Sequence, residues 1–225
     1  PLLSTLIIGL LMFFVIGLPI VWATEALTEF LEGLQGSGKF LFGSIVGGMA
    51  AFDFGGPVNK VASLFADGLL LEGVQGPEAV KVLASMVPPF GVTISWVLSK
   101  IVRKRKYSKE EEDNIKIAFP MGLCMITEGV IPIAAVDPLR VIFSCTVGAA
   151  IGGGLSMSWG VGSPVPSGGV FIIPAMTDPL KFTLALLIGS AITGILLFVL
   201  KKEPVENEIK DDEEEEEEDF SSRSE

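Results

Sequence analysis

Long uncharged, hydrophobic blocks fill most of the first 200 positions of the chain, in place of the short amphipathic periods of a water-soluble domain. A helix that crosses a membrane needs about 20 consecutive, mostly apolar residues. Residues 2–22, 82–101, 141–159 and 182–200 meet this requirement and are predicted to be simple spans. The uncharged block that begins at Val141 is too long for one helix, and the proline- and glycine-rich residues 162–169 are predicted to break it. The pattern therefore predicts an all-α, polytopic integral membrane protein.

Three other stretches, residues 44–60, 126–140 and 160–174, mix apolar residues with glycine, proline and polar side chains. Irregular backbone survives at membrane depth only where it is buried in protein or lines a water-filled cavity. We therefore expect re-entrant hairpins or broken helices at these three places, within a helical bundle. Polar side chains inside such a bundle are costly, so they are candidates for a functional site.

The distribution of charge indicates how the chain is oriented. Residues 100–109 hold six Lys and Arg, and Lys201 and Lys202 close the last predicted span. Basic loops are retained on the cytoplasmic side of a membrane, so we expect both sites to be cytoplasmic and residues 73–79 to lie outside. The net charge of −11 comes mainly from residues 201–225, a polar stretch with 13 acidic and 4 basic side chains, which we expect to form a disordered cytoplasmic tail.

The cysteines do not indicate a metal or redox site. Cys124 and Cys145 lie in apolar segments without a CxxC pair, and the chain contains no histidine. We interpret both as packing residues and expect no metal site and no disulfide framework. The sequence predicts no cofactor and no nucleic-acid partner.

The polar side chains of the irregular stretches are of types that suit a polyhydroxyl ligand. A carboxylate accepts hydrogen bonds from two sugar hydroxyls, an amide both donates and accepts, and glycine lets backbone amides approach closely. Nothing in their spacing resembles a catalytic triad. The candidates are Asp53, Asn59, Lys60, Thr127, Glu128, Asp137, Arg140, Ser163 and Ser167.

Several of these residues also have structural explanations. Asp137 directly precedes Pro138 and is expected to cap the helix that starts there, rather than to contact a ligand. Lys60 either pairs with Asp53 or extends to the membrane interface. Glu128 lacks such an explanation, because an unpaired buried carboxylate is costly. A buried glutamate would, however, also suit a proton relay.

Two motifs carry a family resemblance: AFDFGGPVNKVA at residues 51–62 and MITEGVIPIAAVDPLRVIFS at residues 125–144. Their order, their spacing and the basic loop between them resemble the membrane-embedded IIC component of the fructose-specific sugar phosphotransferase system. The resemblance extends over about residues 1–200. It implies an all-helical transport portion that moves against a homodimeric scaffold, and an N-terminally incomplete chain whose early spans precede Pro1.

The resemblance also implies partners and residue roles. Fructose would be carried across the cell membrane and phosphorylated by a phosphocysteine of a IIB partner, which a IIA partner supplies with phosphate. Glu128 would bind the sugar and act as a base that helps to deprotonate the attacking hydroxyl. Ser167 stands where many members of the family have a histidine. The sugar-binding residues implied beside Glu128 are Asp53, Asn59, Lys60, Thr127 and Ser167.

Two other functions stay open from the sequence. A secondary transporter coupled to ions or protons would equally use broken helices and a buried glutamate. A membrane protein that is a remnant of the IIC component would keep the motifs without transporting. Uptake that depends on phosphoenolpyruvate and yields sugar phosphate would distinguish a IIC permease from both alternatives.

Overall fold

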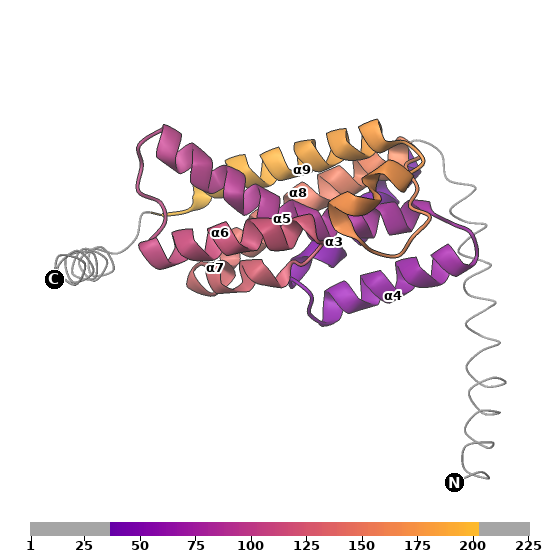
Figure 1. Cartoon of the computed structure of the whole chain (residues 1–225), viewed down its shortest axis with the longest axis horizontal. Coiled ribbons are helices and arrows are strands. Elements are labelled where there is room, and N and C mark those ends of the chain that lie inside the picture. Colours follow the sequence, from indigo (N-terminus) through magenta and orange to yellow (C-terminus); the bar gives the residue numbers. More distant parts are fainter. Residues whose placement is uncertain (1–36, 203–225) are drawn as a thin grey trace, which may run out of the picture.

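The computed structural model describes residues 37–202 (Figure 1). The predicted span 2–22 and residues 203–225 of the acidic tail lie outside the described residues. The described part of the chain is helical and contains no strand, which confirms the all-α prediction. In chain order its elements are α3 (Ser37–Phe52), α4 (Pro57–Leu71), α5 (Gly76–Ile101), α6 (Lys109–Leu123), η2 (Glu128–Val130), α7 (Ile131–Val136), α8 (Pro138–Ser158), η3 (Gly169–Ala175) and α9 (Pro179–Leu200).

Three of the described helices, α5, α8 and α9, are long and apolar enough to cross a membrane. They correspond to the predicted spans 82–101, 141–159 and 182–200. α5 begins earlier than predicted, because Pro77 stands in its first turn, where a missing backbone N–H is harmless. The charged residues Glu78 and Lys81, which ended the apolar block in the sequence, are buried inside this helix.

The helices are interrupted at all three stretches that were predicted to be irregular. Residues 53–56 separate α3 from α4, and these two helices contact each other through Phe42 and Phe65, whose ring centroids are 6.0 Å apart. A 3-10 turn and the short α7 follow α6 in place of one continuous helix. Residues 159–168 have no helical structure, as the predicted break required.

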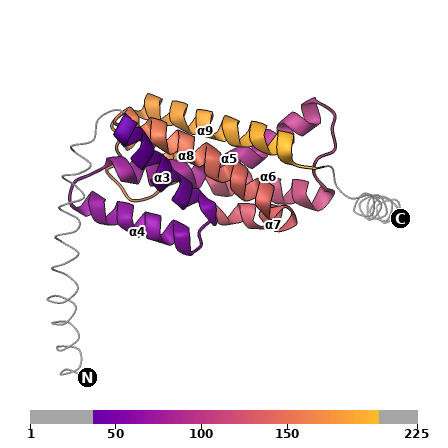
Figure 2. The ribbon, with the colours of Figure 1, turned by 180° about the vertical axis from the view of Figure 1, so that it is seen from behind.

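α8 approaches both α3 and α9 through glycine. A Cβ added at Gly43 of α3 would lie 2.5 Å from the backbone oxygen of Gly153 in α8. A Cβ added at Gly148 of α8 would lie 2.5 Å from the backbone oxygen of Gly189 in α9. Figure 2 shows α3 and α8 side by side. Such close approach allows helices to associate within lipid, which is as apolar as the side chains themselves.

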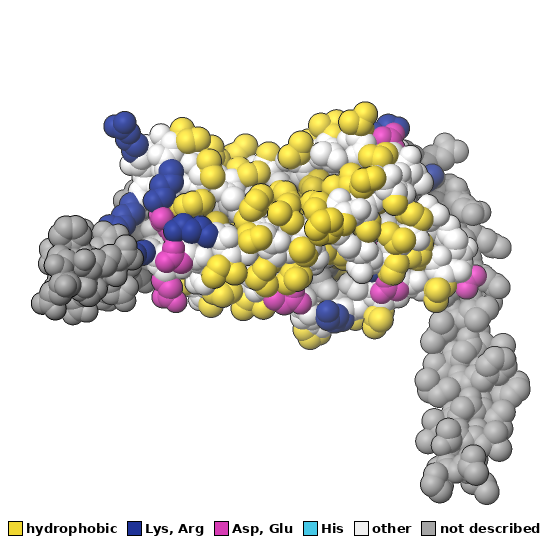
Figure 3. Space-filling view, viewed as in Figure 1, with side chains coloured by type: hydrophobic (Ala, Val, Ile, Leu, Met, Phe, Trp, Pro, Cys, Tyr) yellow, Lys and Arg dark blue, Asp and Glu magenta, His cyan; other side chains and the backbone are white. Residues whose placement is uncertain are grey.

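Large hydrophobic side chains lie on the outside of the bundle (Figure 3). The most exposed of them, at 71% or more, are Leu64, Leu71, Ile101, Leu139, Phe171 and Leu180. A water-soluble monomer rarely exposes extensive apolar surface, whereas in a bilayer such side chains contact lipid. The surface therefore agrees with the prediction of a membrane protein.

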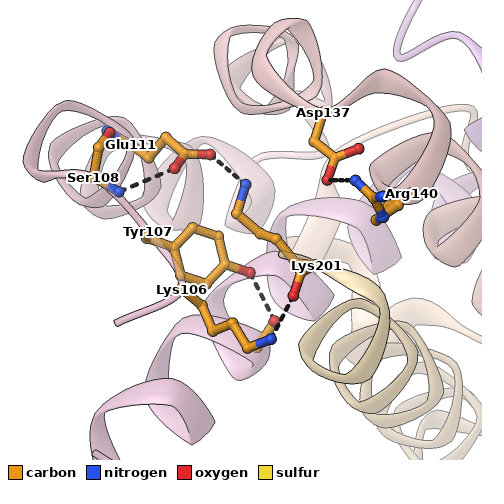
Figure 4. A network of polar contacts seen from close by, with 8 residues as sticks. Lys106, Tyr107, Ser108, Glu111, Asp137, Arg140 and Lys201 are labelled. Carbon is orange, nitrogen blue, oxygen red and sulfur yellow. Dashed lines mark hydrogen bonds and ion pairs between the residues drawn. The ribbon is translucent and has the colours of Figure 1, made fainter. Parts of the chain in front are cut away.

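The basic loop between α5 and α6 lies beside the end of α9 (Figure 4). The Lys201 ammonium is 2.6 Å from Glu111 Oε1, and both side chains are 5% exposed. The Lys201 carbonyl accepts a hydrogen bond from the Lys106 ammonium. The Tyr107 hydroxyl donates to Ser95 Oγ at 2.7 Å, and burial raises the pKa of Tyr107 far above its ordinary value. The two basic segments thus lie together, as predicted for one side of a membrane, and their cytoplasmic location stays a prediction.

Candidate functional site

A cavity of about 260 Å³ lies where the three interrupted stretches meet α5. This volume lies just below the usual range for ligand pockets, which suits a small ligand. Most of the side chains that line it are polar or charged. The lining residues are Gly55, Asn59, Lys60, Ser63, Asp67, Lys81, Ser85, Met125, Thr127, Glu128, Pro166 and Ser167.

The structure brings together five of the six residues predicted to bind a sugar. They are contributed by α4, by the segment at the start of η2 and by the loop after α8, so the two motifs of the sequence meet in space. Their role as ligand contacts stays a prediction. The five are Asn59, Lys60, Thr127, Glu128 and Ser167.

Glu128 is the first residue of η2, and its side chain lies against the turn between α3 and α4. A Cβ added at Gly55 would be 2.6 Å from Glu128 Oε1, and the φ of Gly55 is +101°, a conformation that glycine adopts readily. Glu128 is exposed where the cavity opens, in one of the stretches predicted to be buried in protein or to line a water-filled cavity. Within residues 37–202 its carboxylate has no hydrogen bond and no ion pair, so both oxygens are free to accept hydrogen bonds from a ligand.

Asp53, the sixth predicted residue, does not line the cavity but holds the start of α4. Its carboxylate accepts hydrogen bonds from the backbone N–H groups of Val58 at 2.7 Å and Asn59 at 2.9 Å. The first turn of a helix leaves such groups without partners, so this contact stabilises α4. The Asn59 side chain donates to the Ala50 carbonyl and accepts from Ser63 Oγ at 3.3 Å. Asp53 therefore positions Asn59, which does line the cavity.

The other polar candidates differ in their surroundings. Lys60 is exposed at the cavity and, among the described residues, forms no ion pair with Asp53, which removes one of its two structural explanations. Ser167 is exposed in the loop after α8. Ser163 is buried, and its hydroxyl donates to the Val165 carbonyl at 2.8 Å rather than lining the cavity.

A charged group on the cavity wall was missed by the sequence analysis. The Lys81 ammonium of α5 lies 2.5 Å from Asp67 Oδ1 of α4 and 2.7 Å from Glu78 Oε1. The sequence held a signal for part of this group, since Asn59, Ser63 and Asp67 recur at intervals of four and share one face of α4. No span was predicted over α4, so this polar face was not recognised.

Asp137 and Arg140 pair with each other and do not line the cavity. Arg140 Nη1 donates to Asp137 Oδ2 at 2.8 Å (Figure 4). Asp137 stands at the N-cap position of α8, as predicted, but its side chain makes no capping hydrogen bond, since it binds Arg140 instead. Cys145 is buried, as expected of a packing residue, whereas Cys124 is exposed at the end of α6, contrary to expectation.

Comparison with known proteins finds relatives over most of the chain. The sequence is 43% identical over 202 residues to the PTS system fructose-specific EIIC component of Haloferax volcanii, covering 89% of the chain and 53% of the relative. It is 40% identical over 209 residues to the PTS system fructose-specific EIIB'BC component of Escherichia coli, covering 92% of the chain and 36% of the relative. It is 38% identical over 208 residues to the fructose permease IIC component of Bacillus amyloliquefaciens, covering 92% of the chain and 66% of the relative. The chain thus spans about a third to two thirds of these relatives. No family model matches the sequence, and no solved structure matches it.

Proposed function

We propose, from the premise that this chain belongs to the fructose-specific IIC family of sugar phosphotransferase systems, that it forms the sugar-binding part of a membrane permease. The permease would carry fructose, or a similar sugar, across the cell membrane as the sugar is phosphorylated. The observation that carries the proposal is the cavity in which the two motifs meet around the carboxylate of Glu128, which has no partner among residues 37–202.

The cavity offers the groups that recognise a sugar. Glu128 accepts hydrogen bonds from hydroxyls, Ser167 and Thr127 carry hydroxyls of their own, and Lys60 donates. These groups come from separate elements, so they approach a ligand from several sides. A site of this kind fixes the orientation of a small polar molecule, which is the main requirement for phosphoryl transfer.

The proposed chemical step takes place at one hydroxyl of the bound sugar. The hydroxyl oxygen attacks the phosphorus of a phosphocysteine, the new O–P bond forms as the S–P bond breaks, and the cysteine leaves as a thiolate. Glu128 accepts the hydroxyl proton and later releases it to water. Apart from this proton transfer, the chain contributes the position of the sugar.

The phosphocysteine is proposed to belong to a IIB domain that a IIA domain supplies with phosphate. The names of the relatives in Escherichia coli, EIIB'BC, and in Bacillus subtilis, EIIABC, combine such components with the C component. This chain contains no histidine, and of its two cysteines Cys145 is buried within α8 while Cys124 lies at the exposed end of α6 in an apolar segment of sequence, which favours a donor outside the chain. In the proposed assembly the permease is a homodimer, and residues 201–225 face the cytoplasm.

Sugar uptake into membrane vesicles tests the proposal. With the soluble phosphotransferase components and phosphoenolpyruvate, the wild type is expected to release sugar phosphate inside the vesicles. Glu128→Gln removes the negative charge and the base but keeps the shape, so phosphorylation should be lost while the protein still inserts. Glu110→Gln, at an exposed position on α6, is the matched control and should retain activity.

Two results would contradict this function. Normal turnover by Glu128→Gln would refute the role of that residue. Accumulation of unmodified sugar, driven by an ion gradient without phosphoenolpyruvate, would instead identify a secondary transporter.

A further inference from the structure

The charged cluster of Asp67, Glu78 and Lys81 has no part in the function proposed above. One ammonium contacts two carboxylates, at 2.5 Å for Asp67 and 2.7 Å for Glu78. The Lys81 side chain is 5% exposed and that of Glu78 is fully buried, whereas that of Asp67 is 40% exposed. Asp67 and Lys81 line the cavity and are therefore accessible to a ligand there.

A role in holding α4 against α5 does not explain why the cluster contains two carboxylates and one ammonium. One carboxylate would neutralise Lys81, but the cluster contains two, so it carries excess negative charge when all three groups are ionised. Neither oxygen of Glu78 forms a well-aligned hydrogen bond within the described part of the chain, although Oε1 contacts the ammonium. Charged groups with unused hydrogen-bonding capacity are costly inside a membrane protein and indicate a functional site.

The cluster retains groups that can bind hydroxyls. An ammonium has three N–H donors, and that of Lys81 donates one to Asp67 Oδ1 and lies in ion-pair contact with Glu78, which leaves at least one N–H for a ligand. Asp67 contacts Lys81 through Oδ1, and its side chain is 40% exposed, so the carboxylate can accept a further hydrogen bond from a ligand in the cavity. A sugar hydroxyl can accept a hydrogen bond from Lys81 and donate one to Asp67, and hydrogen bonds to charged groups are stronger than neutral ones.

The position of the cluster in the cavity is defined by the spacing along α4. Asp67 follows Asn59 by eight residues, which corresponds to about 12 Å along a helix. Glu128 lies at the Asn59 end, beside Gly55. Ser63 of α4 and Ser85 of α5 line the cavity between the two ends. The cavity is therefore polar along its length, with a carboxylate at each end.

We propose that Asp67 and Lys81 form a second hydroxyl-binding subsite, at the opposite end of the cavity from Glu128. This inference rests on the proposed function and adds to it the recognition of the part of the sugar that does not react. Glu128 contacts the hydroxyl to be phosphorylated, while Asp67 and Lys81 bind a hydroxyl at the other end of the molecule. Specificity among sugars that share the reacting end then depends on this subsite.

Equilibrium binding of fructose and of deoxyfructose analogues, each lacking one hydroxyl, tests the subsite without phosphoenolpyruvate. The wild type in membranes is expected to bind one analogue about 10- to 100-fold more weakly than fructose, the usual effect of losing a charge-assisted hydrogen bond. Asp67→Asn should bind fructose more weakly by a similar factor and should no longer distinguish fructose from that analogue. Glu128→Gln should no longer distinguish fructose from a different analogue, the one that lacks the hydroxyl bound by Glu128.

Two further variants complete the test: a second probe of the subsite and a control for the loss of a carboxylate elsewhere. Lys81→Met alone leaves Glu78 without its cation, so the combined variant Glu78→Gln/Lys81→Met is the second probe and should show the same loss as Asp67→Asn. Asp113→Asn removes a carboxylate from the exposed ion pair with Lys116, where the contact distance is 2.6 Å, and should bind every analogue as the wild type does.

The subsite would be overturned by wild-type affinity for fructose in Asp67→Asn. It would equally be overturned by a loss of affinity in Asp67→Asn that is the same for fructose and every analogue. A wild type that binds fructose but transfers no phosphate would refute the proposed reaction and leave the subsite standing. A wild type that binds no sugar would refute both.

Discussion

The buried ion pair between Glu111 and Lys201 allows a sharp test of the structure. It joins the first turn of α6 to the end of α9, 90 residues apart in the sequence, with Nζ 2.6 Å from Oε1. Both side chains are 5% exposed, so the small energies of surface pairs do not apply. Removing one partner of a buried pair costs about 3–5 kcal/mol, because the other charge is left in a poorly solvated place.

The lower end of that range applies to Lys201→Met. In this variant the Glu111 carboxylate keeps the hydrogen bond that it accepts from the Ser108 backbone N–H at 3.0 Å. The Lys201 ammonium also lies 5.0 Å from the centre of the Tyr107 ring, and that cation–π contact is lost. We expect a loss of about 3 kcal/mol, or roughly 100-fold in the folding equilibrium.

Unfolding in mixed detergent micelles, followed by tryptophan fluorescence, measures this loss. The combined variant Glu111→Gln/Lys201→Met removes both charges and should recover most of the stability. Lys116→Met, which breaks an exposed pair, should leave the unfolding midpoint unchanged. An unchanged midpoint in Lys201→Met, or a combined variant less stable than the single one, would refute the buried pair.

Two glycine substitutions test the site and the helix packing. Gly55→Ala places a methyl group 2.6 Å from Glu128 Oε1 at a φ of +101°, so equilibrium sugar binding should weaken and stability should fall by about 1–3 kcal/mol. Sugar affinity equal to that of the wild type would contradict the placement of Glu128. Gly148→Ala forces apart the backbones of α8 and α9 and should cost about 1–3 kcal/mol in the same micelle assay. Gly68→Ala, in α4 with open space around it, is the control and should not destabilise the protein. Equal losses of stability in Gly148→Ala and Gly68→Ala would argue against the close contact between α8 and α9.

Hydrophobic pattern alone was enough to predict the three described spans and the breaks between them. It placed the start of α5 too late, because Glu78 and Lys81 ended the apolar block. Lys81 contacts both Glu78 of its own helix and Asp67, which the chain brings from a different helix. A pairing between elements has no signature in a local window of sequence.

The two motifs likewise predicted most of the residues that line the cavity, but not their exposure or their hydrogen bonds. The apolar neighbours of Glu128 left open whether it is a buried carboxylate or part of a water-filled cavity, and the structure exposes it where the cavity opens. Asp53 was grouped with the sugar-binding residues because it shares a motif with Asn59. Its carboxylate is instead used by the backbone of α4, a contact that depends on the turn at residues 53–56.

The hydrogen bonds of Asp53 have a consequence for the interpretation of mutational screens. A change at Asp53 that frees the first turn of α4 displaces Asn59 and should abolish transport as completely as a change at Glu128. A screen scored by growth on the sugar would therefore place both carboxylates in one class, although only Glu128 lines the cavity. Asp53→Asn keeps one acceptor oxygen for the two backbone N–H groups, so it should retain partial growth in such a screen, whereas Glu128→Gln should retain none. Tolerance of the amide thus distinguishes a carboxylate that supports the wall of the cavity from one that serves the substrate.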